Sequence, residues 1–517
     1  MTDILLLFPH PENAHPDPGL VKTLLRASRG SLVSFHIPKL APDGRGLEKE
    51  QFASYHYQAG NDLSTVGPEF RLREVVLLKS PAKSSSHFVL AYLWSFPDST
   101  FDVDAVRIPR GGRNDPRNSP MGKNPGNIWA FSRPLGSKLP GTQFTLDVSD
   151  EIPAICSGRI EVPAIQRFVT CHTKSGDRVM VWGVPREVDS LEKVVAKLGR
   201  RFDTLSSGSA DPPPSLELAA ETPPVMASPL AKNGVLPASG GVDSPPGAHF
   251  YICDCRFGLE KATFPPVSDV VTSPPYNYSY SPFNVPRPDR KTGELVSPER
   301  VGYSDEMSAP KYRGLLKSTF EAIDRRLDPS SADVFVNIKN NYGGAQCIPP
   351  FWLIRLVPDS WALADLLIWR YDISFDPARL KYKPYYEWVL RFARGDIRFR
   401  KGHRYLRDFY LPILKGNSLE RLELAHPAIY PKELVKQCLG ECSHQGLVLD
   451  PFLGSGSTLA AATELGRASV GFELDGKYVH DIETRLKGAK RPNPSEYPNG
   501  GRVLPPEFPK EAPIFQH

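Results

Sequence analysis

The segment 447–465 constrains the fold more than any other part of the chain, because it reads as a strand, a glycine turn and a helix. Its apolar first part ends at Asp450, and Gly454 and Gly456 allow positive φ angles and close backbone approach. A strand that passes into a helix through glycines is typical of the ligand-binding edge of an α/β fold. We therefore expect a parallel sheet with a nucleotide-type ligand at this turn.

The ligand is expected to be an adenosine without a phosphate chain. The turn has no Lys and its glycines are not spaced as G-x-G-x-x-G, so a di- or triphosphate is poorly supported. About 20 residues further on, Glu473 ends a second short strand, a position that takes ribose hydroxyls in doubly wound folds. Ser457 or Thr458 is expected to cap the intervening helix.

A second motif, Thr272–Tyr276 (TSPPY), follows the strand-like run 267–271. Two consecutive prolines fix φ and remove two backbone donors, so the nearby carbonyls are expected to be unpaired and to face outward. An aromatic ring stands next to these acceptors. The combination suits a flat ring whose amine donates hydrogen bonds while its face stacks. An ordinary proline-rich turn after a strand is the alternative.

Together the SPPY and DPFxGSG motifs resemble the S-adenosylmethionine-dependent amino-methyltransferases of DNA. Because SPPY comes first, the chain resembles the β-class, a circular permutation of the shared fold. Over residues 248–490, the resemblance implies an α/β, Rossmann-like methyltransferase fold with S-adenosylmethionine as cofactor. Ser273 is typical of cytosine-N4 enzymes, whereas adenine-N6 enzymes usually carry Asp or Asn there. The resemblance thus favours methylation of cytosine at N4.

The resemblance also implies roles for the SPPY residues. The hydroxyl of Ser273 and the carbonyl of Pro274 accept hydrogen bonds from the target amine, Pro275 stiffens the loop, and Tyr276 stacks on the base. No metal or covalent enzyme intermediate is required. Since a base inside a duplex cannot reach such a pocket, the target has to be flipped out of double-stranded DNA.

Candidate cofactor-binding residues lie at strand ends and on the glycine turn: Asp254, Asp450, Phe452, Gly454, Gly456 and Glu473. By resemblance, Asp254 reaches the adenine amine and Glu473 the ribose hydroxyls. Asp450 and the glycine backbone hold the methionine portion, and Phe452 lies near the adenine. Segment 383–392 resembles the family's His-Glu segment with Tyr386 in place of His, and 426–434 resembles the lead-in to the cofactor loop, with Tyr430 in place of Phe.

Affinity for DNA is suggested by local charge more than by the net charge of +5. Residues 379–407 contain ten Lys or Arg against two acids, with aromatic residues interleaved. A solvated basic face is the alternative. The candidate DNA contacts in this run are Arg391, Arg394, Arg398, Arg400, Lys401 and Arg404.

The first half of the chain, 1–205, resembles a degenerate copy of the second. Segments 163–168 and 176–182 stand where the lead-in helix and the cofactor strand are expected, but Trp182–Pro185 replaces the glycine turn, so this half should not bind the cofactor. We expect a degenerate methyltransferase-like or DNA-recognition domain; an unrelated α/β domain is the alternative. A second basic run contributes three candidate DNA contacts, Arg107, Arg110 and Arg113.

Composition supplies the remaining expectations. Segment 206–247 reads as a flexible Pro/Ser-rich linker and 491–517 as an irregular Pro-rich tail. With no run of 18 apolar residues and no signal peptide, the protein is expected to be cytoplasmic. The seven cysteines are dispersed, as reduced thiols are, and neither Cys253 with Cys255 nor Cys438 with Cys442 and His444 makes a credible zinc site.

Three functions are compatible with these observations. The first is a site-specific cytosine-N4 DNA methyltransferase that protects DNA from a partner restriction endonuclease. The second is adenine-N6 methylation by the same site, because the shape of the pocket as well as Ser273 decides which amine fits. The third is a DNA-binding module without activity. RNA as the substrate, the recognition sequence and the oligomeric state are left open.

Overall fold

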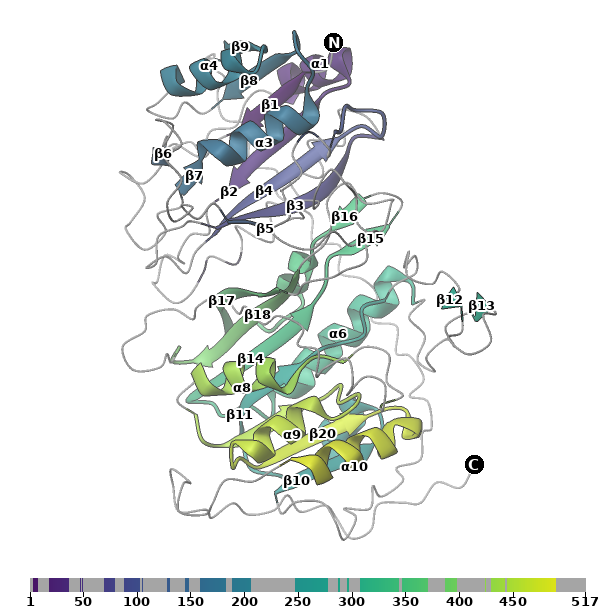
Figure 1. Cartoon of the computed structure of the whole chain (residues 1–517). Helices are drawn as coiled ribbons and strands as arrows, with labels where there is room; N and C mark the ends of the chain where they lie inside the picture. The colour runs from purple at the N-terminus through teal and green to yellow at the C-terminus, as the bar shows by residue number, and fades with distance from the viewer. Residues whose placement is uncertain are drawn as a thin grey trace, which may run out of the picture.

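The computed structural model has two seven-stranded sheets, one from each half of the chain (Figure 1). Side chains from both sheets belong to one core. The structure describes residues 3–7, 18–36, 47, 49, 69–79, 88–102, 105, 128–130, 145–147, 159–182, 188–205, 247–277, 287–288, 295–296, 307–343, 346–370, 386–397, 424, 429–441 and 444–489. The predicted linker and tail lie almost wholly outside these residues. None of the described helices has the length and apolarity that a membrane span requires.

The second half of the chain forms a seven-stranded sheet of order β10-β20-β19-β11-β14-β18-β17. The first five are parallel, and β18 runs antiparallel to both of its neighbours. The strands are β10 (Ala248–Ile252), β11 (Val267–Thr272), β14 (Ser331–Ile338), β17 (Trp361–Arg370), β18 (Tyr386–Gly395), β19 (Leu447–Asp450) and β20 (Ser469–Glu473). This confirms the predicted Rossmann-like α/β fold, and it places the SPPY strand β11 beside the glycine-turn strand β19.

Helices cover both faces of this sheet. On one face Val270 and Val334 share a core with α5 and α6, and on the other Val271 and Phe335 share a core with α8 and α9. The elements outside the sheet are α5 (Cys255–Lys261), α6 (Ala309–Asp324), η3 (Pro350–Arg355), α8 (Lys432–Glu441), α9 (Ser457–Glu464), η4 (Gly476–Tyr478), α10 (Val479–Gly488) and the short strands β12 (Arg287–Pro288), β13 (Leu295–Val296), β15 (Asn341–Gly343) and β16 (Gln346–Ile348).

The first half of the chain forms another seven-stranded sheet, of order β5-β3-β4-β2-β1-β8-β9. Its strands are β1 (Ile4–Leu7), β2 (Ser31–His36), β3 (Arg71–Lys79), β4 (Phe88–Ser95), β5 (Ile128–Ala130), β8 (Arg178–Trp182) and β9 (Arg201–Thr204). The remaining described elements are α1 (Pro18–Ser28), β6 (Thr145–Asp147), β7 (Arg159–Glu161), α3 (Val162–His172) and α4 (Val188–Lys197). The expected helix and strand at 163–168 and 176–182 correspond to α3 and β8.

Six strands of the two sheets correspond in order and direction. Starting from β9, the order β9-β8-β1-β2-β4-β3 in the first sheet corresponds to β20-β19-β11-β14-β18-β17 in the second. In each sheet the fifth strand of this run, β4 or β18, is antiparallel to both of its neighbours. Both antiparallel pairs also shift register at one place, between Leu72 and Glu74 and between Leu363 and Asp365. In each, the acid after the shift accepts the next backbone N–H. The two sheets thus share a local irregularity as well as their strand order. That the first half is a degenerate methyltransferase-like domain stays a prediction.

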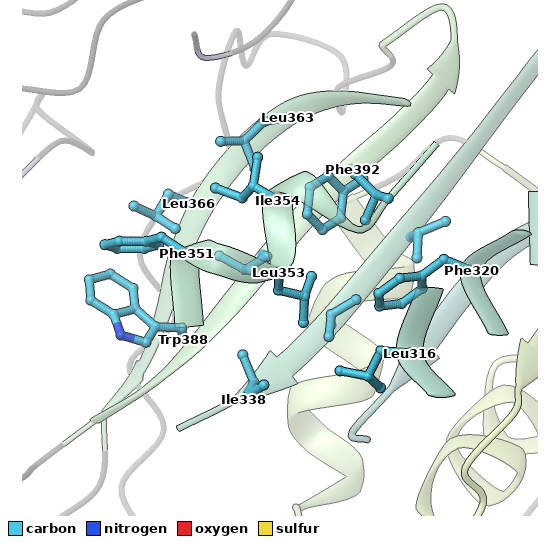
Figure 2. Close-up of a cluster of buried hydrophobic side chains, with 14 of the residues drawn as sticks. Leu316, Phe320, Ile338, Phe351, Leu353, Ile354, Leu363, Leu366, Trp388 and Phe392 are labelled. Carbon is cyan, nitrogen blue, oxygen red and sulfur yellow. The ribbon is translucent and has the colours of Figure 1, made fainter. Parts of the chain in front are cut away.

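A continuous apolar core joins the two halves. Val75 of β3 and Leu366 of β17 belong to the same core, and β16 lies against β3. Tyr386 donates a hydrogen bond to the Val75 carbonyl at 2.9 Å, and the N–H of Leu47 donates to the carbonyl of Leu363 at 2.6 Å. In Figure 2, side chains of η3 lie among those of α6, β17 and β18.

A buried ion network lies toward the amino ends of the parallel strands. Arg391 pairs with Asp333 at 2.7 Å, and Asp333 also contacts His444 at 2.9 Å. Arg467 pairs with Asp269. Burial opposes ionisation of Asp333, but Arg391 and His444 lower its pKa. Asp269, Asp333 and His444 have the spacing of metal ligands, yet each carboxylate already faces an arginine.

The expectation that Arg391 contacts DNA is therefore wrong. Its side chain is 0% exposed and faces Asp333 inside the sheet packing. A fully buried guanidinium cannot reach a phosphate. The basic run misled because the first eight residues of β18, an interior strand, are all buried, and burial cannot be read from a count of charges.

Replacing Arg391 with Met should lower the free energy of unfolding by about 3–5 kcal/mol, because Asp333 would be left as a buried charge without its main partner. Denaturant unfolding followed by circular dichroism measures this loss. Lys317→Met on the exposed face of α6 removes the same charge and serves as the control. A stability equal to that of the control would contradict the structural role of the network.

Candidate active site

The two predicted motifs meet at the carboxyl edge of the second sheet. Because β11 and β19 are parallel neighbours, Thr272 at the end of one lies beside Asp450 at the end of the other. The hydroxyl of Thr272 donates to Asp450 Oδ1 at 2.7 Å. The SPPY loop and the glycine turn, 178 residues apart in the chain, are thus joined by a side-chain hydrogen bond.

Asp450 is enclosed by protein donors. Its Oδ1 also accepts the Phe452 N–H at 3.1 Å, and its Oδ2 accepts the Tyr430 hydroxyl at 2.9 Å. The residue is 0% exposed, and burial raises the pKa of its carboxyl. A ligand could reach this carboxylate only after a rearrangement, so the predicted direct contact with methionine is corrected. Asp450 instead holds the two motifs together.

Tyr430, which stands where the family that the chain resembles usually has Phe, forms contacts at this edge that the sequence did not predict. Its hydroxyl contacts both Asp450 and Thr458 Oγ1, and its carbonyl accepts the hydroxyl of Ser457 at 2.8 Å. Burial, followed by the charge of Asp450, raises the pKa of Tyr430. The extra hydroxyl relative to Phe is the signal in the sequence that could have identified this contact.

The glycine turn has the backbone that the sequence predicted. Gly454 has φ of 55° and Gly456 has φ of 83°, both in the left-handed region. The predicted helix cap is wrong, however: Gly456 occupies the N-cap of α9 without a side-chain hydrogen bond. The hydroxyls of Ser457 and Thr458 instead reach Tyr430 and the Val271 carbonyl.

Glu473 ends β20 and braces the glycine turn from the neighbouring strand. Its Oε2 accepts the Gly454 N–H at 2.7 Å, and its Oε1 accepts the Asp475 N–H at 2.9 Å. Only 7% of Glu473 is exposed, and burial raises its pKa to about 7. Next along the edge, Asp254 caps α5 and pairs with Arg256 at 2.6 Å. Burial opposes ionisation of Asp254, but Arg256 lowers its pKa.

The SPPY loop presents acceptors, although fewer than expected. The Pro275 carbonyl accepts the hydroxyl of Tyr312 from α6, so it is not free. Among the described residues, the Pro274 carbonyl receives no hydrogen bond. Asn277, at φ of 52°, closes the loop by bonding both backbone groups of Met307 through its side chain.

Polar side chains from β14 and β18 complete the edge beside the loop. The hydroxyls of Ser273 and Tyr276 are 2.9 Å apart, and Tyr276 donates to Glu387 Oε2 at 2.9 Å. Asn337 Nδ2 donates to Glu387 at 2.8 Å and to Tyr276 at 3.1 Å. Lys339 Nζ lies 3.0 Å from Glu387 Oε1. Glu387 reaches this edge because β18 runs antiparallel, so its amino end meets the carboxyl ends of the others.

The first sheet has apolar residues at the corresponding positions. When the two sheets are aligned on their shared register shift, four polar residues of the second sheet fall on apolar ones: Thr272 on Leu7, Asn337 on Phe35, Glu387 on Val89 and Asp450 on Val181. At these four positions, therefore, only the second sheet carries side chains that can form the hydrogen bonds described above. That the first half binds no cofactor stays a prediction.

The predicted DNA contacts are not assembled at this edge by the described residues. Arg394, near the far end of β18, donates to the carbonyls of Asp324 and Leu327 at the end of α6, away from this edge. The other candidates lie outside the described residues: Arg107, Arg110, Arg113, Arg398, Arg400, Lys401 and Arg404.

The raised pKa of Glu473 predicts a stability that depends on pH. The Glu473 carboxyl binds its proton more tightly in the folded protein than in the unfolded chain. The resulting contribution to the free energy of unfolding is therefore complete below pH 4.5 and is lost as pH rises to about 7. We expect the Glu473→Gln variant to lack this decline, which amounts to roughly 3 kcal/mol. Urea unfolding across this window measures it. Glu321→Gln, at an exposed site on α6, should keep the wild-type slope; an unchanged slope in Glu473→Gln would contradict the assignment.

Comparison with known proteins finds similarity in the second half. The chain is 42% identical over 74 residues to the Type II methyltransferase M.ScaI of Streptomyces caespitosus, covering 14% of this chain and 24% of that protein. It is 37% identical over 92 residues to the Type II methyltransferase M.HinfI of Haemophilus influenzae, covering 17% and 25%. The chain thus aligns with about a quarter of the length of these curated relatives.

A solved structure, that of PvuII DNA methyltransferase (cytosine-N4-specific), is 19% identical and covers 48% of this chain and 95% of that chain, with a TM-score of 0.36. The family model that matches is that of the N6/N4 methylases, described as DNA methylase, over residues 267–484. From β11 to α10, this chain is therefore similar to the DNA methylases that modify exocyclic amines.

Proposed function

We propose that the second half of the chain transfers a methyl group from S-adenosylmethionine to an exocyclic amine of a base in double-stranded DNA. The hydrogen bond between Thr272 and Asp450 carries the proposal, because it sets an amine-binding loop against a glycine turn of the cofactor-binding type. The match to the DNA methylase family over both motifs supports it.

The glycine edge fits the proposed cofactor. The turn 451–456 has no Lys or Arg, which suits an adenosine ligand without phosphates, and carboxylates stand at the ends of two neighbouring strands. Glu473 would hold the ribose hydroxyls, Asp254 the adenine amine, and the backbone of Gly454 and Gly456 the methionine portion. Phe452, partly buried at the turn, would contact the adenine. When bound, S-adenosylmethionine supplies an electrophilic methyl group.

The SPPY loop would prepare the amine for attack. The lone pair of a cytosine or adenine amine is delocalised into the ring, so the nitrogen has to move toward tetrahedral geometry. Hydrogen bonds from the amine to the Ser273 hydroxyl and the Pro274 carbonyl favour this change, and the ring of Tyr276 would hold the flipped base. Orientation of this kind is worth about 7–11 kcal/mol in well-placed intramolecular reactions.

We assign the target as cytosine N4, because a serine precedes the two prolines. Adenine N6 is the second candidate, and the family model covers both amines. The first half of the chain would clamp or read the DNA, and a restriction endonuclease would be the partner, as in restriction-modification systems. The relatives that carry the name Type II methyltransferase support this context.

Methyl transfer to unmethylated genomic DNA tests the proposal. With isotope-labelled S-adenosylmethionine, mass spectrometry of the nucleosides should show labelled N4-methylcytosine. Ser273→Ala should lower kcat by about 100- to 1,000-fold, because an interaction with the reacting amine is lost. Ser318→Ala, on α6, is the matched control and should be unaffected.

Each alternative predicts a different product. Labelled N6-methyladenine would contradict the choice of base and leave the reaction class intact. No labelled nucleoside from the wild-type protein would contradict the proposed activity. Full activity of Ser273→Ala would contradict the assigned role of its hydroxyl.

A further inference from the structure

Glu387 is a buried carboxylate beside the reacting loop, to which the proposed reaction assigns no task. It is 3% exposed, and both of its oxygens have protein partners. Lys339 Nζ lies 3.0 Å from Oε1, while Oε2 accepts from Tyr276 at 2.9 Å and from Asn337 at 2.8 Å. Burying a charge is costly unless it is paired and hydrogen-bonded, and these three donors meet that requirement.

The position of Glu387 determines the direction of a chain of hydrogen bonds. A carboxylate can only accept, so the single hydrogen of the Tyr276 hydroxyl points to Glu387. The 2.9 Å contact between Ser273 and Tyr276 then requires Ser273 to be the donor. With its only hydrogen used, Ser273 has lone pairs alone to offer to a ligand.

Asn337 is oriented by the same carboxylate. Its Nδ2 donates both to Glu387 and to the Tyr276 hydroxyl. The opposite orientation of the amide would place its carbonyl oxygen against the carboxylate, which is unfavourable. Asn337 therefore supplies a second donor to Tyr276, and the Tyr276 oxygen accepts from Asn337 and Ser273 while donating to Glu387.

We propose that Glu387 is a positioning residue that makes Ser273 a pure hydrogen-bond acceptor for the target amine. The inference rests on the proposed methyl transfer and deepens it. In the chain from Ser273 through Tyr276 to Glu387, each donor polarises the next, so the serine oxygen becomes a stronger acceptor than an isolated hydroxyl. Lys339 balances the charge at the end of the chain and lies 5.2 Å from the centre of the Tyr276 ring.

The phenolic hydroxyl of Tyr276 gains a function distinct from that of its ring. Stacking on a base requires the aromatic face alone, and Phe would supply it equally well. The hydroxyl is what connects Ser273 to Glu387. In the first sheet the position of Glu387 is held by Val89 and that of Asn337 by Phe35, so the chain of hydrogen bonds has no counterpart there.

Steady-state kinetics of Glu387→Gln tests the inference, because Gln keeps the shape but its amide can donate and so reverse the chain. We expect kcat to fall about 10- to 100-fold, by analogy with residues that orient a metal ligand through a hydrogen bond. The KM values for S-adenosylmethionine and for DNA should not change. Glu464→Gln, which removes another lysine-paired carboxylate in α9, should leave kcat unchanged.

A double-mutant cycle separates positioning from general support of the fold. Tyr276→Phe cuts the chain, so it should lower kcat by a similar factor, and adding Glu387→Gln should then have no further effect. The inference would be overturned if the two substitutions lowered kcat by factors that multiply in the double variant, or if they changed KM alone. If Glu387→Gln did not fold, Tyr276→Phe would still decide, because an unchanged kcat in that variant overturns it. If the wild-type protein transfers no methyl group, the proposed function is contradicted. If the wild-type protein is active and Glu387→Gln has the same kcat, only this inference is contradicted.

Discussion

The hydrogen bond between Thr272 and Asp450 is the interaction on which the candidate site depends. It joins two segments that the chain separates by 178 positions, and it does so where two parallel strands end side by side. A buried carboxylate needs donors, and Asp450 finds them in Thr272, Tyr430 and the turn that follows it. The same contacts that satisfy its charge therefore bring the SPPY loop against the glycine turn.

Charged groups are arranged differently at the two ends of the second sheet. Toward the amino ends, two arginines pair with Asp333 and Asp269 inside the packing. At the carboxyl edge, Glu387 and Glu473 are tied to loop and turn groups that surround the site. The first network contributes stability, while the second orients side chains toward the proposed reaction.

The two large sheets share six strands in order and direction, and both shift register between their last two shared strands. Apolar packing and backbone hydrogen bonds set these features, so they do not depend on the polar side chains at the strand ends. Leu7 and Val181 fill the positions of Thr272 and Asp450 without altering the sheet. Tyr386, which directly precedes Glu387 in the sequence, links the two halves, because its hydroxyl donates a hydrogen bond to the Val75 carbonyl.

The sequence by itself determined the α/β class, the order of the two motifs and the positive φ at Gly454 and Gly456, because glycine spacing and apolar runs act locally. It did not predict that Asp450 is enclosed, that Arg391 is buried or that Ser457 leaves the helix cap to Gly456, since those outcomes depend on partners distant in the chain. The link from Ser273 through Tyr276 to Glu387 was likewise decided by tertiary structure alone. Only an antiparallel strand brings Glu387 to the edge where the parallel strands end, and no local pattern encodes that pairing.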